Sequence, residues 1–440
     1  IVPDVRCGKG MSSCFAGALV DRKWDSLYNL GKITKRDRRG EHSLDAKQDF
    51  SRGSMAGNIL RMAIPMTIAQ MVNVLYSVVD RFFIGHIDGA SSMALTGVGI
   101  VFPIISVITA FTNLFGMGGA PLCSIARGRQ DLDLAGRIQG SSCYMLALTA
   151  VVLTAIGVLF MRPILEVFGA SPDTYPYARD YFSVYIWGTP FAMLGLGMNG
   201  FINSQGFGRV GMVTITAGAV VNAVLDPVFI FVLHQGVRGA AIATVISQLV
   251  SALWVMKFLT GKRALIPLRR TQIRWQPEIL KDTVQLGFSH FIMSFTNAVT
   301  QFAYNYELRA LGGDVLVGAM TVINSVREVT MPANGLTGGA QPVLGYNYGA
   351  GEYRRVKQGI LFMTAVCLVY MLAAWGLVFV FPHELMGLFT DNQELVDTGA
   401  GMLHIYFFGF CFMAFQMSGQ ATFTGLGKAK FAIFFSLFRK

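Results

Sequence analysis

From about residue 58 onward the chain alternates long apolar stretches with short polar connections, whereas residues 1–54 are polar and mixed in charge. Each apolar stretch is long enough to cross the hydrocarbon core of a bilayer, about 30 Å thick, as an α-helix. The pattern predicts helices at residues 58–85, 92–118, 137–160, 179–203, 209–233, 238–260, 281–309, 316–342, 355–380 and 397–424, and an eleventh from Ala429. The expected fold class is therefore an all-α membrane protein.

Short motifs recur along the chain at a separation of about 220 residues. The Gly-Gly-Ala-Pro run at 118–121 is echoed at 338–342, and the Gly-rich turn at 205–209 is echoed at 424–428. An even number of predicted helices separates the copies, so both copies have the same orientation. This predicts two parallel-related bundles of six helices, a layout common among secondary transporters. Of the twelve helices expected, the last two are predicted to be truncated or missing.

The predicted helices divide the chain into four parts. We expect a flexible polar cytoplasmic segment at 1–54, a six-helix lobe at 55–260, a basic cytoplasmic linker at 261–281 and an incomplete lobe at 282–440. On one side of the predicted membrane the connections are rich in Lys and Arg, and on the other they contain only Arg162, Arg179, Arg238 and Arg309. Positive charge collects in cytoplasmic loops, so the N-terminus is expected to be cytoplasmic.

Composition agrees with a membrane location. Of the 440 residues, 53% are hydrophobic and 14% are charged, compared with about 25% charged residues in soluble domains. The net charge of +11 is explained by the cytoplasmic connections, and no nucleic-acid partner is expected. We predict a monomeric, multi-pass protein of the plasma (inner) membrane whose partners are lipid and small cationic molecules.

Signatures of soluble enzymes are absent from the sequence. It contains no Walker loop, no GxSxG, no HExxH and no His or Cys cluster with metal-ligand spacing. The chain is therefore predicted to be a secondary active transporter rather than an enzyme. No cofactor is expected, and its energy is expected to come from an ion gradient or a partner.

A polar stripe runs along one face of the first predicted helix. Asn73, Ser77 and Asp80 are spaced i, i+4 and i+7, which places them on the same face. Such a face has to meet protein or water rather than lipid. Asp80 is a candidate cation ligand, because adjacent helix residues diverge by about 100° and a pair with Arg81 is disfavoured.

The fifth predicted helix contains a second polar face. Asn222 and Asp226 are one turn apart, and Pro227 follows directly. Because proline has no N–H, the carbonyl one turn earlier loses its partner and a kink is expected. Amide, carboxylate and freed carbonyl oxygens suit a hard cation, and a carboxylate in such a site can also take up a proton.

Charged residues also occur within predicted helices of the second lobe. Arg327 and Glu328 are adjacent in the eighth predicted helix, where they are candidates for a substrate contact or for a charge pair between helices. Glu307 lies near the outer end of the seventh, within reach of solvent. The first lobe is therefore the expected place of the coupling chemistry.

Three segments together carry a family resemblance. They are residues 64–86 with the run Tyr-Ser-Val-Val-Asp-Arg-Phe-Phe-Ile-Gly-His, residues 225–230 (Leu-Asp-Pro-Val-Phe-Ile), and residues 338–350 (Gly-Gly-Ala-Gln-Pro-Val-Leu-Gly-Tyr-Asn-Tyr-Gly-Ala). They resemble the first, fifth and eighth helices of multidrug and toxic compound extrusion (MATE) transporters, in the MepA-like and archaeal-type prokaryotic branch. The resemblance covers about residues 55–440.

The resemblance implies twelve helices in two lobes and export of cationic amphipathic compounds in exchange for H⁺ or Na⁺. The family's cation-binding network falls on six positions of this chain: Asn73, Asp80, Asn199, Asn222, Asp226 and Thr244. The only metal expected is Na⁺, at Asp80, Asn222 and Asp226. Binding is expected to rearrange the first lobe around Pro65 and Pro227.

Alternatives remain open at this stage. A lipid-linked glycan flippase or a metabolite exporter would share the fold, although a flippase cavity should be strongly cationic and few basic residues lie within these helices. An intramembrane enzyme would need a nucleophile or metal cluster at membrane depth. A single-bundle receptor or channel would lack the internal repeat.

Overall fold

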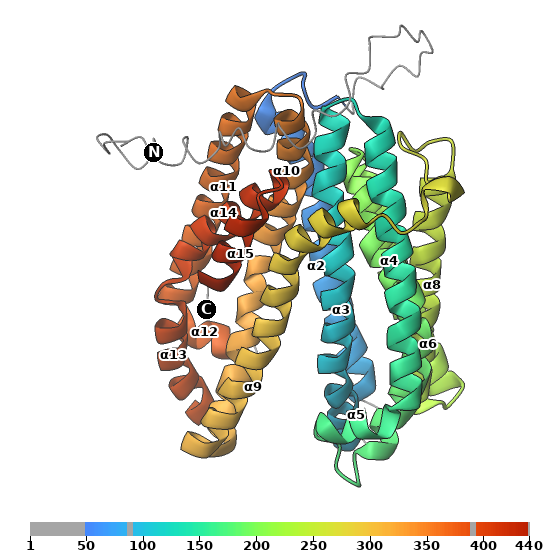
Figure 1. Ribbon diagram of the computed structural model, residues 1–440. Coiled ribbons are helices and arrows are strands. Elements are labelled where there is room, and N and C mark those ends of the chain that lie inside the picture. The colour runs from blue at the N-terminus through green and yellow to red at the C-terminus, as the bar shows by residue number, and fades with distance from the viewer. Residues whose placement is uncertain (1–48, 86–90, 388–392, 439–440) are drawn as a thin grey trace, which may run out of the picture. The chain divides into compact units, whose positions relative to one another are not determined.

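The computed structural model describes residues 49–85, 91–387 and 393–438, which all belong to one compact unit, Asp45–Lys440. Throughout these ranges the regular elements are helical, as predicted (Figure 1). The first bundle consists of α2(Met55–Gly85), α3(Ser91–Gly128), α4(Leu132–Leu159), α5(Met161–Val167), α6(Tyr175–Ser204), α7(Gly208–Pro227), η2(Val228–Val232) and α8(Gly236–Thr260). Residues 1–48, most of the predicted N-terminal segment, lie outside the described residues.

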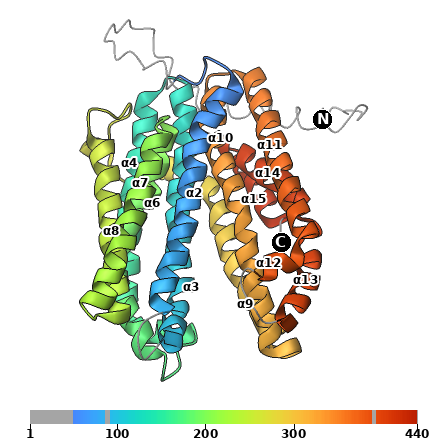
Figure 2. The same ribbon diagram turned by 180° about the vertical axis from the view of Figure 1, so that it is seen from behind.

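The second bundle follows a connection that contains η3(Arg270–Gln272). It consists of α9(Pro277–Arg327), η4(Glu328–Thr330), α10(Met331–Gly349), α11(Tyr353–Val380), α12(Pro382–Gly387), α13(Gln393–Phe407), η5(Phe410–Phe412), α14(Met413–Gly425) and α15(Ala429–Phe438). Figure 2 shows α2 and α10 side by side where the bundles meet, and their residues are in contact. The predicted all-α, two-bundle fold class is confirmed.

Six of the described helices are long and apolar enough to cross a membrane: Met55–Tyr76, Gly97–Gly128, Leu132–Leu159, Gly208–Val232, Gly236–Thr260 and Tyr353–Val380. A seventh span is formed if Val396–Phe407 and Phe410–Gly425, which meet at a 43° bend, count as one. The chain is therefore a multi-pass membrane protein. Apolar side chains such as Val151 and Val369 remain exposed on these helices because lipid, rather than water, is their solvent.

The predicted boundary between the seventh and eighth helices is wrong. The turn expected between residues 309 and 316 is absent, because α9 continues as helix over 51 residues from Pro277 to Arg327. The break comes later, at η4(Glu328–Thr330). Pro332 explains this position, since it lacks the N–H that would bond to the carbonyl of Glu328 one turn earlier. Gly312 and Gly313 permit a turn but do not impose one.

Glycines line the interface between the bundles. A Cβ added to Gly118 of α3 would collide with the Thr283 carbonyl of α9, and one added to Gly339 of α10 would collide with Ala63 of α2. Gly287 approaches the Leu114 carbonyl equally closely. We call these contacts the glycine seam. Positions 118 and 339 belong to the repeated Gly-Gly motif. Each copy of the motif therefore brings its own bundle into close backbone contact with the other bundle.

The predicted linker packs against the first bundle. The Gln205 side chain accepts a hydrogen bond from the Ile266 amide (3.0 Å) and donates to the Ile266 carbonyl (3.4 Å). Gln139 of α4 accepts a further bond from Gln205 at 3.2 Å. The basic side chains of this connection face outward, with Lys262, Arg263, Arg269, Arg270 and Arg274 exposed.

Candidate functional site

The backbone changes its helical form at the end of α7. Regular α-helix stops at Pro227, and η2(Val228–Val232) is a π-helix that closes with a 2.9 Å bond from the Leu233 amide to the Val228 carbonyl. Proline cannot donate to the carbonyl of Ala223, so the α-helical ladder is interrupted here. Single π-helical turns are frequent at functional sites. Pro65, in contrast, lies inside α2 without ending it.

A polar network lies one turn before this change. Asn222 and Asp226 are both fully buried, and Asn222 Nδ2 donates to Asp226 Oδ1 at 3.2 Å. The same nitrogen donates to Thr244 Oγ1 on α8 at 3.4 Å. The Thr244 hydroxyl in turn donates to the Ala240 carbonyl at 3.0 Å. Two predicted residues of α7 and one of α8 therefore meet inside the first bundle.

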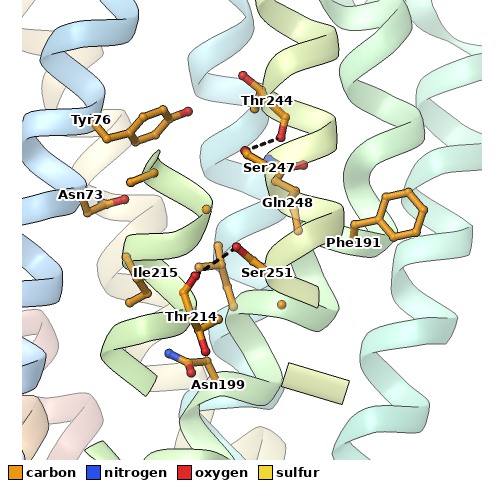
Figure 3. Close-up of a pocket in the computed structure, with 15 residues that line it drawn as sticks. Asn73, Tyr76, Phe191, Asn199, Thr214, Ile215, Thr244, Ser247, Gln248 and Ser251 are labelled. Atoms are coloured by element: carbon orange, nitrogen blue, oxygen red, sulfur yellow. Dashed lines mark hydrogen bonds between the residues drawn. The ribbon is translucent and has the colours of Figure 1, made fainter. Parts of the chain in front are cut away.

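A small cavity of about 130 Å³ adjoins this network, between α2, α6, α7 and α8. Thr244 lines it together with Asn73 and Asn199, two further positions predicted from the resemblance. Figure 3 shows Asn73 and Tyr76 of α2 on one side and the polar side chains of α8 on the other. Pockets for drug-sized ligands have volumes of about 300–1,000 Å³, so this cavity is too small for a drug. It is large enough for an ion with a few waters.

Several lining residues were not predicted. Ser247, Gln248 and Ser251 follow the predicted Thr244 at i+3, i+4 and i+7 on α8. This is the spacing that singled out Asn73 and Asp80 on α2, so the same rule could have found the α8 residues. Thr214 on α7 carries no such sequence signal, because its carbonyl, not its side chain, accepts the 3.2 Å bond from Ser251.

Two buried amide oxygens beside the cavity are available as ligands. Asn199 Oδ1 and Asn222 Oδ1 accept no hydrogen bond from any described residue. The amide nitrogens of both residues are engaged, that of Asn199 by the Gly211 carbonyl at 3.3 Å. Leaving a buried acceptor unsatisfied costs about 1–3 kcal/mol. Asn222 Oδ1, the Thr244 hydroxyl and the Asp226 carboxylate lie together and offer oxygens of the kind that bind Na⁺ or a proton. Asn199 bonds to Gly211, 15 residues before Asp226 on α7, and therefore lies at the other end of the cavity.

The remaining predicted residues lie elsewhere. Asp80 belongs to α2, but its side chain lies outside the described residues. Arg327 and Glu328 lie in the second bundle at the η4 break, where Arg327 Nη1 donates to the Tyr406 hydroxyl at 3.4 Å. Within the described residues no ion pair joins Arg327 to Glu328. Glu307 is exposed on α9.

Comparisons with known proteins are consistent with this arrangement. A family model described as MatE matches residues 65–228 and 290–439, more than half of the chain. The multidrug export protein MepA of Staphylococcus saprophyticus is 26% identical over 381 residues, which cover 86% of this chain and 84% of that protein. MepA of Staphylococcus haemolyticus is 24% identical over the same shares.

Solved structures share the fold. The outward-facing structure of a multidrug resistance MATE family transporter of the MOP superfamily has a TM-score of 0.83 at 24% identity, covering 90% of this chain and 88% of that one. A MOP superfamily transporter from Pyrococcus furiosus has the same TM-score of 0.83 at 23% identity, with 90% and 88% covered.

Proposed function

This chain belongs to the MatE family of multidrug and toxic compound extrusion proteins, and from that premise we propose that it exports cationic amphipathic compounds in exchange for H⁺ or Na⁺. It is a secondary active transporter, with an ion gradient in place of a cofactor. The MepA relatives, which are multidrug export proteins by name, support this substrate class.

The observation that carries the proposal is the buried network of Asn222, Asp226 and Thr244 beside a polar cavity. An ionisable residue at membrane depth is costly and marks an ion pathway in most membrane proteins. In our proposal the coupling ion enters the cavity past Asn199 and is held at its other end by Asp226, Thr244 and the amide oxygen of Asn222. Asp80 and Asn73 complete the site from α2.

Coupling follows from a change of charge. When Asp226 binds Na⁺ or a proton its net charge is neutralised, and the packing of α7 against α2 and α8 changes with it. The π-helical turn after Pro227, together with Pro65 on α2, provides the points at which these helices rearrange. The ion drives export only to the extent that it binds the two states of the protein differently.

The proposed location is the plasma (inner) membrane with a cytoplasmic N-terminus and a monomeric protein. The exposed basic side chains of the connection after α8 support this orientation, because such residues collect on the cytoplasmic side. A lipid-linked glycan flippase is the less favoured alternative. None of the cavity-lining residues in the described part of the chain is Lys or Arg, and a pyrophosphate would require such residues.

The test is dye efflux from vesicles that contain the purified protein, with a pH gradient and a Na⁺ gradient imposed separately. We expect one gradient to accelerate export of a cationic dye and the other to have no effect. Export that ignores both gradients, or that requires ATP, contradicts the proposal. Vesicles with empty membranes provide the background rate.

Replacing Pro227 with Ala tests the role of the π-helical turn. Alanine restores the N–H, which allows α7 to continue as regular helix. We expect a gain in unfolding free energy of up to about 3 kcal/mol and a slower export rate, because the rearranging segment becomes rigid. Thermal unfolding and initial efflux rates measure the two effects.

Pro382→Ala is the matched control. Pro382 is the first residue of α12, where the missing N–H would have no helical partner in any case. Its replacement should leave export unchanged. Equal export rates in the Pro227→Ala variant and the parent protein would remove the π-helical turn from the mechanism.

A further inference from the structure

A short segment before α2 is wedged between the two bundles. Residues 49–53, which we call the strap, precede the first helix, and the Phe50 side chain is fully buried. Its ring lies 5.0 Å from the Arg127 guanidinium of α3 and 5.7 Å, edge-on, from the Tyr346 ring of α10. The Arg127 guanidinium is itself 4.7 Å from the Tyr346 ring. Phe50 therefore fills a slot with one wall from each bundle.

The backbone of the strap is held mainly by the second bundle. The Phe50 carbonyl accepts hydrogen bonds from Asn347 Nδ2 at 3.1 Å and Arg355 Nη2 at 3.0 Å, and from Asn58 Nδ2 of its own helix at 3.2 Å. Arg355 Nη1 donates to the Gly53 carbonyl at 3.0 Å. Asn347 Oδ1 accepts from Arg355 Nε at 2.9 Å, which orients both donors.

The first residue of the strap adds a link to the same tyrosine. The Tyr346 hydroxyl donates to Asp49 Oδ1 at 3.1 Å, and the Ser51 hydroxyl and amide donate to the same atom at 2.6 and 3.0 Å. Burial raises the pKa of Asp49, but the bonds from Ser51 and Tyr346 and the charge of Arg52 outweigh burial and lower the pKa below its ordinary value. The carboxylate is therefore charged at neutral pH.

The slot lies beside a close backbone contact between the bundles. Arg127 is almost completely buried, and its Nη1 donates to the Ser204 carbonyl of α6 at 2.6 Å. Next to it, a Cβ on Gly128 would collide with the Tyr346 carbonyl, and one on Gly349 with the Ile125 carbonyl. Separating α3 from α10 at this point would expose the Phe50 ring and remove the aromatic partners of a buried cation.

We propose that the strap is a latch that holds this end of the two bundles closed, and that opening requires Phe50 to leave the slot between Arg127 and Tyr346. A segment that only capped α2 would bond to the first bundle alone, whereas the strap contacts α10 and α11 of the second bundle as well as α2 and α3 of the first. The inference rests on the proposed transport function, and it adds that the two bundles move apart at this end during the transport cycle. In the proposed orientation the latch closes the cytoplasmic end.

Distance measurements between spin labels test the latch without any transport assay. The labels are placed on Asp133→Cys at the start of α4 and Lys357→Cys at the start of α11, both exposed at this end, after replacement of the native cysteines. Phe50→Ala is expected to raise the ratio of open to closed molecules by roughly thirtyfold, from the loss of a desolvated cation–π contact. Arg355→Gln, which removes the bonds to the strap carbonyls, should shift the ratio in the same direction.

Phe408→Ala is the control, because that ring is 78% exposed on the second bundle. It should leave the distances as in the parent protein. Unchanged distances in both Phe50→Ala and Arg355→Gln would overturn the latch, and the second variant keeps the test valid should the first fail to fold. Parent protein that shows no gradient-driven efflux, together with strap variants that still shift the distances, would refute the proposed function and leave the latch standing.

Discussion

Vesicles that contain the Asp226→Asn variant are expected to lose gradient-driven efflux while the protein keeps its fold. Asparagine has the same shape and can accept the bond that Asn222 Nδ2 now makes to Oδ1 at 3.2 Å, so packing of the fully buried site is preserved. It can neither bind a proton nor offer a negative charge to Na⁺. To shift the protein almost completely from one state to the other, the ion has to bind one state about 10⁴-fold more tightly than the other. The variant loses most of this difference in affinity, so we expect the gradient-driven export rate to fall about 100-fold or more.

The rate is measured with the gradient that drives the parent protein, and the fold is checked by thermal unfolding. Asp180→Asn, at an exposed position of α6, is the control and should transport normally. Undiminished driven efflux in the Asp226→Asn variant would exclude Asp226 as the coupling carboxylate. A parallel loss of unfolding temperature would point to a structural role instead.

Gly287→Val is expected to have the second largest effect, because it places a branched side chain within the glycine seam. The Cβ alone would collide with the Leu114 carbonyl, which is backbone and cannot move aside as a side chain can. Overpacking of this kind costs about 1–3 kcal/mol, and more where backbone has to shift. We expect a lower unfolding temperature, bundles held apart at this contact and strongly reduced export.

Gly376→Val on α11 is the matched control, since nothing lies within 4 Å of the Cβ position there. It should change neither stability nor export by a measurable amount. The same spin-label pair, on α4 and α11, reports whether the two bundles have moved apart. Parental stability and distances in the Gly287→Val variant would show that the bundles are not in such close backbone contact.

Most of the helices could be predicted from the sequence, because a long apolar run bounded by Gly or charged residues is compatible with few structures other than a membrane-spanning helix. The 355–380 prediction differs from α11(Tyr353–Val380) by two residues at its start. The turn predicted after residue 309 was wrong, since α9 continues past Gly312 and Gly313 to Arg327 and the break comes just before Pro332. A proline removes a hydrogen bond from a definite position, whereas glycine only lowers the cost of bending.

The candidate site was partly predictable for a similar reason. Asn222 and Asp226 share a face of one helix, so spacing alone brings them together, whereas Asn199 and Thr244 were reached only through the family resemblance. The strap could not be predicted. Phe50 is a single aromatic residue in a polar stretch, and the residues that bury it, Arg127 and Tyr346, are far away in the sequence. Only tertiary structure reveals such a contact.

The glycine seam also has a kinetic consequence. Where two helices touch through bare backbone, no side chain has to leave its rotamer well or withdraw from a groove when they part. The glycine seam therefore adds little to the activation barrier for separating the bundles, and the remaining contacts between the bundles decide when they separate. In the proposed latch, the side chains around Phe50 would therefore contribute most of the barrier to separation at this end, and changes in the strap should alter the rate of opening more than its distance.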